Sequence, residues 1–92
     1  MKSSAQRLAE YYKSDMFLAD FQRLEAEETA GVMAARLTMI SHLRFNLEIV
    51  GVASTPEERR LAAQFEARLI PWHEMLGHVQ AYIESIAARS SD

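Results

Sequence analysis

Cysteine is absent from the sequence. Disulfide bridges, zinc sites built from thiolates and cysteine nucleophiles are therefore excluded. A chain without disulfides suits the reducing cytoplasm, where we expect this protein to be located. Its cysteine-free, alanine-rich composition also leads us to expect a bacterial source.

Proline and glycine are scarce, with two and three residues among 92. No segment shows the strict alternation of apolar and polar residues that marks a half-buried strand. Apolar residues recur instead every three or four positions, and hydrophobic residues make up 49% of the chain, which is enough for a folded core. We therefore expect an all-α protein, and its length limits it to a single helical domain over residues 1–92.

Positive charge is not in excess, because the formal net charge is −3. Binding to nucleic acid needs a basic patch, so we expect no nucleic-acid partner.

Long apolar runs are missing as well. The longest stretch without Asp, Glu, Lys or Arg runs from Met75 to Ile83, whereas a helix that spans a bilayer takes ~20 apolar residues. Residues 1–10 also lack the apolar run of a signal peptide, and we expect a soluble protein with no membrane partner.

Capping signals divide the chain into three expected helices, at about residues 4–13, 15–50 and 56–89. Ser3 with Gln6 forms a capping-box sequence at the start of the first helix. Ser14 or Asp15 would cap the second helix, and one continuous helix through this point is the alternative. Gly51 suits the left-handed residue that ends a helix.

The apolar repeat of the second expected helix is not interrupted by proline. Its later members are Met33, Leu37, Ile40, Leu43, Leu47 and Val50. Gly31 is unfavourable in the middle of a helix by about 1 kcal/mol relative to alanine, and it indicates a kink or a close helix crossing. The third expected helix repeats the pattern from Leu61 through Leu69 to Ile86.

Thr55, Pro56 and Glu58 give the clearest local signal. We expect Thr55 to be the N-cap of the third helix, Pro56 its first residue, and Glu58 the residue that closes a capping box. Pro71 lies within the apolar repeat of the same helix. Because proline has no N–H to donate to the Ala67 carbonyl, we expect the helix to bend there.

The two long helices are expected to form an antiparallel hairpin, because their connection has only about four residues. Apolar side chains cover more of the second helix than one neighbour can bury. We therefore expect a homodimer in which two hairpins form a four-helix bundle. Four residues of the second helix are placed at the dimer interface, namely Ala35, Met39, Phe45 and Ile49. The alternative is a monomer whose first helix covers this flank.

Histidine and acidic residues raise the question of a metal site. His73 and His78 are five positions apart, which turns them about 140° from each other on a helix, so one zinc ion cannot bind both. Folding the hairpin about its loop brings Glu28 to the level of His78. A metal-binding helical bundle that uses these two residues is therefore an alternative function, whereas our first expectation is a protein without cofactor or metal.

His42 lies in the segment 41–51, which resembles the phospho-accepting box of histidine-kinase dimerisation domains. The resemblance rests on the Ser-His start and on Arg44, while one residue after the histidine and the helix-bending proline are missing. It implies a histidine phosphotransfer protein with His42 as the phospho-acceptor. The residues by themselves indicate a partly buried His42 that bonds to Glu66 or Gln64 of the facing helix.

Four large side chains lie near the first joint, namely Tyr11, Tyr12, Met16 and Phe17. If the first helix leaves them uncovered, they form an apolar end patch of the kind that marks partner sites. No nucleophile–base pair is apparent, so a binding protein is favoured over an enzyme. We therefore predict a non-enzymatic, dimeric helical interaction module, such as a small adaptor, regulator or chaperone-like protein, that binds another protein through an apolar surface.

Overall fold

The computed structural model describes residues 1–90, and the side chains of residues 1–89. Within this range the chain forms helices and no strand, so the expectation of an all-α protein is confirmed there. The helices are α1 (Ser4–Lys13), α2 (Asp15–Thr29), α3 (Ala35–Ile49), α4 (Pro56–Glu66) and α5 (Trp72–Ser90). None of the helices in residues 1–90 combines the length and the apolarity that a bilayer crossing requires.

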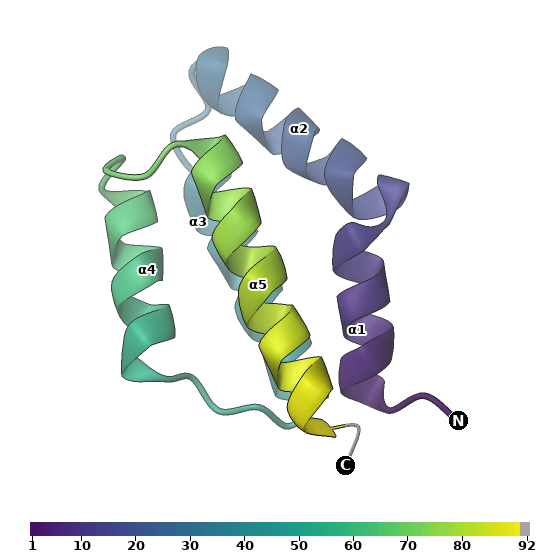
Figure 1. Cartoon of the computed structure of the whole chain (residues 1–92). Coiled ribbons are helices and arrows are strands. Elements are labelled where there is room, and N and C mark those ends of the chain that lie inside the picture. The colour runs from purple at the N-terminus through teal and green to yellow at the C-terminus, as the bar shows by residue number, and fades with distance from the viewer. Residues whose placement is uncertain (91–92) are drawn as a thin grey trace.

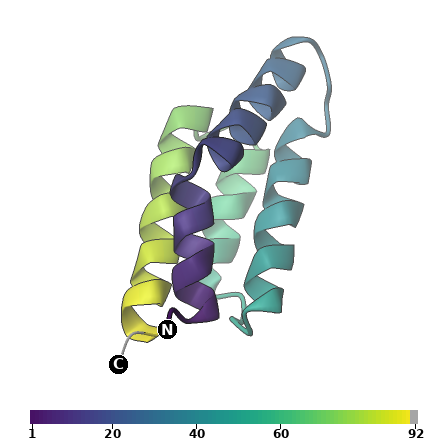
Figure 2. The same cartoon turned by 90° about the vertical axis from the view of Figure 1, so that its right-hand side faces the viewer.

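The helices form a bundle in which α1 and α2 run in the same general direction and each later helix reverses the direction of the one before it (Figures 1 and 2). α1 packs along α5, α2 along α3, and α3 along α4. One chain therefore forms a bundle of four antiparallel elements. α1 and α2 together make up the first element, and α3, α4 and α5 are the other three. The expected hairpin of two long helices is not what forms, and the neighbours that we assigned to a second copy come from the same chain.

Side-chain caps begin α1, α2 and α4 at positions that the sequence predicts. Ser3 and Gln6 form the capping box of α1, with both hydrogen bonds present. Ser14 ends α1 and begins α2, because its hydroxyl accepts a hydrogen bond from the Phe17 N–H. Thr55 caps α4 through its hydroxyl in the same manner. The chain therefore forms two separate helices on either side of Ser14, and not one continuous helix.

The expectation of one helix over residues 15–50 is wrong, because the chain turns back between α2 and α3. Gly31 has a φ of +101°, which lies in the left-handed region. The Gly31 and Val32 N–H groups donate to the Glu28 and Glu27 carbonyls and so close the end of α2. Nothing lies within 4 Å of the position that a Gly31 Cβ would take. Glycine is therefore needed for the backbone conformation, and not for a close helix crossing.

The expectation of one helix over residues 56–89 is wrong for a similar reason. α4 ends at Glu66, and Arg68 adopts the left-handed φ of 63°. The Leu69 N–H donates to the Gln64 carbonyl at 2.9 Å, which closes α4 in the way that the glycine turn closes α2. The chain then reverses direction into α5 (Figure 1).

Pro71 stands directly before α5 and bends no helix. Its carbonyl accepts a hydrogen bond from the Met75 N–H at 3.0 Å, so it occupies the N-cap position of the new helix. The loss of a hydrogen bond to the Ala67 carbonyl, on which the expected bend rested, does not arise because α4 has already ended.

Three apolar residues that carried the helical repeat across the two breaks are exposed to solvent. The exposed fractions are 76% for Met33, 51% for Leu37 and 72% for Leu69. The turns keep the spacing of three or four residues while the chain changes direction. The apolar repeat in the sequence therefore runs on through both turns, although the helices end there.

The core is built from the apolar faces of all five helices. Its largest fully buried side chains are those of Tyr12, Ile40, Phe65, Met75, Val79 and Ile83. Trp72 makes edge-to-face contacts with Phe21 and Phe65, with ring centroids 5.2 and 5.0 Å apart. The indole thereby joins α2 and α4 at the start of α5.

Two of the four residues expected at a dimer interface belong to this core. Ala35 and Met39 are only 1% and 2% exposed, so they cannot contact a second copy. They are buried because α2 folds back along α3, which the expected continuous helix would not allow. Phe45 and Ile49 remain on the surface.

Arg36 is buried where the two unexpected turns meet. Its guanidinium pairs with the Glu28 carboxylate, with Nε–Oε2 and Nη2–Oε1 distances of 2.6 and 3.2 Å. Nη1 donates to the Phe65 and Ile70 carbonyls at 2.8 Å each. Trp72 Nε1 donates to the same carboxylate at 3.1 Å. One side chain therefore ties the α2–α3 turn to the α4–α5 turn.

Candidate functional site

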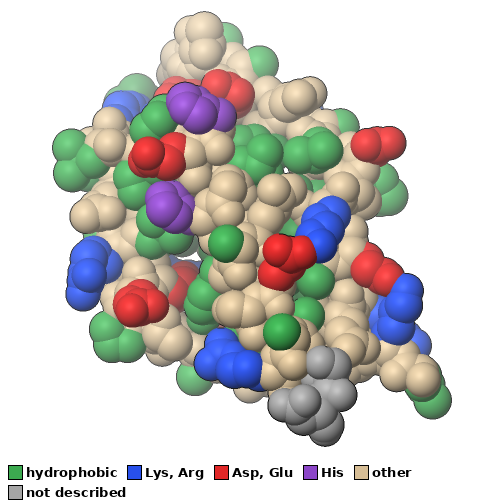
Figure 3. All heavy atoms as spheres, viewed as in Figure 1, with side chains coloured by type: hydrophobic (Ala, Val, Ile, Leu, Met, Phe, Trp, Pro, Cys, Tyr) green, Lys and Arg blue, Asp and Glu red, His purple; other side chains and the backbone are tan. Residues whose placement is uncertain are grey.

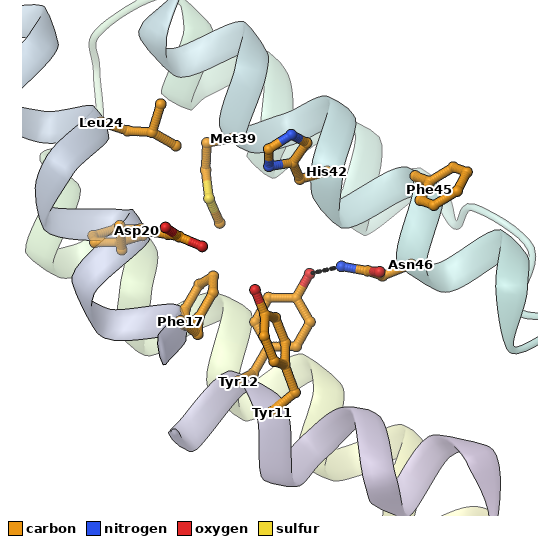
Figure 4. A pocket seen from close by; sticks show the side chains of 10 residues that line it. Tyr11, Tyr12, Phe17, Asp20, Leu24, Met39, His42, Phe45 and Asn46 are labelled. Carbon is orange, nitrogen blue, oxygen red and sulfur yellow. Dashed lines mark hydrogen bonds between the residues drawn. The ribbon is translucent and has the colours of Figure 1, made fainter. Parts of the chain in front are cut away.

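A cavity of about 340 Å³ lies between α1 and α2 on one side and α3 on the other (Figure 4). It is lined by Tyr11, Tyr12, Phe17, Asp20, Phe21, Leu24, Met39, His42, Phe45 and Asn46. α1 packs along α5 whereas α2 packs along α3, so the bend at Ser14 leaves the end of α1 apart from α3. The cavity occupies this space, and most of its walls are aromatic or aliphatic.

Asn46 and Tyr12 join α3 to α1 across the cavity. The Asn46 Nδ2 group donates to the Tyr12 hydroxyl at 3.0 Å (Figure 4). Burial raises the pKa of Tyr12 above its ordinary value of 10.0, and the hydrogen bond from Asn46 acts in the opposite direction. Tyr12 is therefore a neutral phenol at physiological pH.

Aromatic rings form the wall of the cavity on the side of α1 and α2. The Phe17 ring lies 4.4 Å from the Tyr12 ring and 5.8 Å from the Tyr11 ring, measured between centroids. Rings at such distances and tilted angles attract one another through their quadrupoles. This wall is therefore formed before any ligand arrives.

A second hollow of about 270 Å³ continues the cavity along α1 and α3. It is lined by Ser4, Arg7, Leu8, Tyr11, Asn46, Ile49 and Val50. The two hollows share Tyr11 and Asn46. We refer to them together as the α1–α3 cleft.

Large apolar side chains are exposed at this cleft. Phe45 is 63% exposed and Ile49 is 65% exposed. Single exposed apolar residues are normal on a soluble protein. These two, however, flank a cleft whose lining is mostly apolar, and exposed apolar side chains beside such a cleft are typical of an interaction site.

The cleft unites residues that the sequence assigned to two separate surfaces. Its lining includes three residues of the expected partner-binding end patch and three of the expected dimer interface, namely Tyr11, Tyr12, Phe17, Met39, Phe45 and Ile49. Met16, the fourth residue of the end patch, is exposed but lines neither hollow. Asp20 and Asn46 were not expected at a site. The only sequence signal for Asn46 is that it is a polar residue next to Phe45.

His42 is exposed and lies at the edge of the cavity, across from Asp20 (Figure 4). The expectation of a partly buried His42 that bonds to Glu66 or Gln64 is wrong. Ile40 faces the core, and His42 follows two residues later, which rotates it by about 200° on the helix. It therefore lines a cavity with α2 and does not face α4.

Glu28 and His78 do not form the alternative metal site. Hydrogen bonding from Arg36 is the main reason that the pKa of Glu28 lies below its ordinary value, so this carboxylate is already occupied by a cation. His78 lines a different cavity, between α4 and α5. Residues 1–89 contain no group of three or more His, Cys, Asp or Glu side chains that could hold a metal ion. Within one chain, Glu28 and His78 therefore do not share a site.

The chain matches no protein-family model, no curated protein and no solved structure. The geometry and chemistry of the α1–α3 cleft are thus the basis for a functional assignment. A largely preformed, apolar cleft with a few polar groups is typical of a binding site.

Proposed function

We propose that this protein is a non-enzymatic, cytoplasmic helical interaction module that binds an apolar segment of another protein in the α1–α3 cleft. The observation that carries the proposal is the exposure of Phe45 and Ile49 beside a cavity with aromatic walls. Burying an apolar side chain of this size contributes about 1.5–3 kcal/mol. Two such side chains in a preformed cleft supply a large part of the free energy that a specific complex needs.

An amphipathic helix is the partner segment that fits the cleft best. The lining residues of α3 and its C-cap run from Met39 to Val50, which corresponds to about 16 Å along the helix. A helix lying in such a groove inserts apolar anchors at positions i, i+3 or i+4 and i+7, which span about 10 Å. The cleft is therefore long enough for two to three anchors.

Homodimerisation is the self-complementary form of the same proposal. In a two-fold dimer the same surface of each copy faces the other. Phe45 and Ile49 of one copy would then lie against those of its partner, and Ala35 and Met39 take no part because they are buried. We retain the dimer on this smaller surface.

The test replaces the exposed residues of the cleft by glutamate. Phe45→Glu and Ile49→Glu should weaken partner binding by ~30-fold or more, because a buried unpaired charge is costly. Leu69→Glu is the matched control, since Leu69 is 72% exposed and lies on the α4–α5 turn away from the cleft. Circular dichroism should show that all three variants stay folded.

Binding is measured by capture from a lysate of the native host, with quantitative mass spectrometry, and by light scattering at micromolar concentration. We expect at least one protein, or a second copy of the chain, to associate with the wild type and with Leu69→Glu but not with the two cleft variants. A wild type that is monomeric and retains nothing beyond what Phe45→Glu retains would contradict the proposal. Equal loss in Leu69→Glu would also contradict it.

A histidine phosphotransfer protein is the second candidate function. The observation that favours it is the exposure of His42 on the surface of a helical bundle, because a phospho-acceptor must be reachable by its donor. The test is transfer of labelled phosphate from a phosphorylated receiver domain. Transfer that is lost in His42→Gln, yet retained when the exposed His73 or His78 is replaced by glutamine, would support this function. Absence of label in the wild type would exclude it.

A further inference from the structure

Asp20 supplies the only carboxylate in the lining of the 340 Å³ cavity of the α1–α3 cleft. Its side chain is 55% exposed, and Figure 4 shows the carboxylate pointing from α2 into the cavity. Arg23 forms a loose ion pair with it, because Nη2 lies 3.8 Å from Oδ1, whereas Arg23 Nη1 donates a hydrogen bond to Glu27 at 3.0 Å. Exposed pairs of this kind contribute little. A ligand in the cavity can therefore reach the Asp20 carboxylate and supply the hydrogen-bond donors that residues 1–89 do not.

The rest of the lining of this cavity also favours a cation. No lysine or arginine lines it, and the faces of the rings in its aromatic wall are electron-rich and attract positive charge. The Tyr11 hydroxyl points into the same space and makes no hydrogen bond within the described part of the chain (Figure 4). His42 lies across the cavity from Asp20, and no ion pair joins the two among the described residues. The cavity therefore offers an acidic group, a hydroxyl oxygen and aromatic surface to one entering cation.

The second hollow of the cleft has the opposite charge. Arg7 is the only charged residue in its lining. The cleft is therefore acidic at its α2 end and basic near the beginning of α1. The face in view in Figure 3 differs, because positive and negative side chains are interspersed over it. The cleft thus selects the charge of a bound segment through single residues at its two ends, and not through a broad field.

We propose that the segment bound in the α1–α3 cleft carries an arginine whose guanidinium enters the 340 Å³ cavity and pairs with Asp20. This inference rests on the proposed function, because it names a residue of the partner helix. A guanidinium has five N–H donors and no acceptor, so it suits a cavity whose free polar atoms are oxygens. It can donate two parallel hydrogen bonds to a carboxylate and stack on an aromatic ring at the same time, whereas an ammonium group does neither.

The position of this arginine in the partner helix follows from α3. His42 marks the level of Asp20 (Figure 4), and Ile49 lines the second hollow. Seven residues separate the two, which corresponds to about 10 Å along the helix. On a partner helix that lies along α3, the same distance separates positions i and i+7. We therefore expect the arginine at one end of the set of anchors and apolar residues at the other two anchor positions, with no second basic residue near Arg7.

The first test needs no partner. The full chain is titrated with n-butylguanidinium, n-butylammonium and n-butylurea, and binding is followed by nuclear magnetic resonance. The guanidinium compound should shift the methyl signals of Leu24 and Met39, which line the cavity. The urea has nearly the same shape but no charge, and it should bind about fivefold more weakly or worse, with the ammonium compound in between. Equal affinity for the guanidinium and the urea, or no binding of the guanidinium at tens of millimolar, would overturn the proposal.

Three variants locate the charge that is recognised. Asp20→Asn keeps the shape of the side chain and should remove the preference for the guanidinium over the urea. Arg23→Gln abolishes the loose ion pair but leaves the Asp20 carboxylate, so it should not weaken binding of the guanidinium. Glu25→Gln is the matched control, because it removes another exposed negative charge of α2 outside the lining. Equal loss of affinity in Asp20→Asn and Glu25→Gln would show that net charge, and not the cavity, binds the guanidinium.

The second test uses the partner whose binding depends on Phe45. This partner should bind Asp20→Asn about fivefold more weakly than the wild type, and binding to Glu25→Gln should be unchanged. A partner that is lost in Phe45→Glu but binds Asp20→Asn as well as the wild type would overturn this inference and leave the proposed function standing. The absence of any partner that depends on the cleft would overturn both.

Discussion

Glu28 and Arg36 are joined by two hydrogen bonds across the turn between α2 and α3. The same guanidinium donates to the Phe65 and Ile70 carbonyls and lies 4.5 Å from the centre of the Phe65 ring. These two carbonyls belong to the end of α4 and to the α4–α5 turn. The pair therefore connects the two reversals that turn an apparent long hairpin into a bundle of shorter helices.

Replacing Arg36 by lysine should lower the free energy of unfolding by about 2–4 kcal/mol. A single ammonium group cannot make the two-point pair with Glu28 and also reach both carbonyls, so buried acceptors are left unpaired. Urea denaturation followed by circular dichroism measures the loss. Arg23→Lys is the matched control, because Arg23 pairs with Glu27 on the exposed surface of α2, where such a change is worth less than about 0.5 kcal/mol. Equal effects of the two replacements would refute the connecting role of Arg36.

Acid should weaken the fold through Glu28. Hydrogen bonding from Arg36 is the largest cause of the lowered pKa of Glu28, whose ordinary value is 4.5. A carboxyl group with a lowered pKa in the folded state stabilises the protein above the ordinary value, and this stabilisation is lost as the pH falls through the folded-state pKa. The wild type should therefore be more stable than Glu28→Gln at neutral pH, and the difference should shrink on acidification. Denaturant titrations at several pH values test this, with the exposed Glu25→Gln as the control.

Replacing Arg68 by glycine should raise the free energy of unfolding by about 0.5–1 kcal/mol. Arg68 holds a φ of 63°, which is unfavourable for a residue with a Cβ and costs a glycine little. Its ion pair with Glu28, at 3.9 Å and on a side chain that is 49% exposed, contributes little to stability. Arg68→Ala keeps the strain and should give no gain. A glycine variant that is less stable than the alanine variant would show that the backbone conformation is not the limiting factor.

Replacing Pro71 by alanine should lower the melting temperature slightly. A proline within a helix would be expected to destabilise it, but here the ring precedes α5 and disrupts no helical hydrogen bond. Alanine gives the unfolded chain more conformations to lose, at a cost of about 0.4–1 kcal/mol. Calorimetry measures the shift. An increase in melting temperature would mean that Pro71 strains the α4–α5 turn.

Local signals in the sequence located the starts of α1, α2 and α4, whereas the starts of α3 and α5 were missed. Ser3, Ser14 and Thr55 cap helices through hydroxyls that accept from the N–H three residues later, and Gly51 takes the expected positive φ. Such contacts involve neighbours in the chain, so they can be read without knowledge of the fold. The expected apolar end patch near Ser14 is wrong in part, because Tyr12 and Phe17 are buried in the core, at 1% and 5% exposed.

The site was only partly predictable. Phe45 and Ile49 were expected on an apolar flank, but nothing in the sequence placed them beside Tyr11 and Phe17. That placement follows from the bend at Ser14 and from the packing of α1 along α5, which are contacts between distant parts of the chain. The capping box expected at Glu58 also forms only in part. The Thr55 hydroxyl accepts a hydrogen bond from the Glu58 N–H, but the Glu58 carboxylate accepts one from the Ser54 hydroxyl, which precedes the helix.

The sequence by itself determined the helical class, the caps and the positions of most core residues, because these depend on propensity, spacing and neighbours within one turn of helix. Only the tertiary structure decided where the long apolar repeats break. A spacing of three or four residues persists through a tight turn, so the repeat is the same on either side whether the helix continues or reverses. The reversals at Gly31 and Arg68 are stabilised by contacts from far along the chain, above all by Arg36, which bonds to carbonyls that lie 29 and 34 residues away.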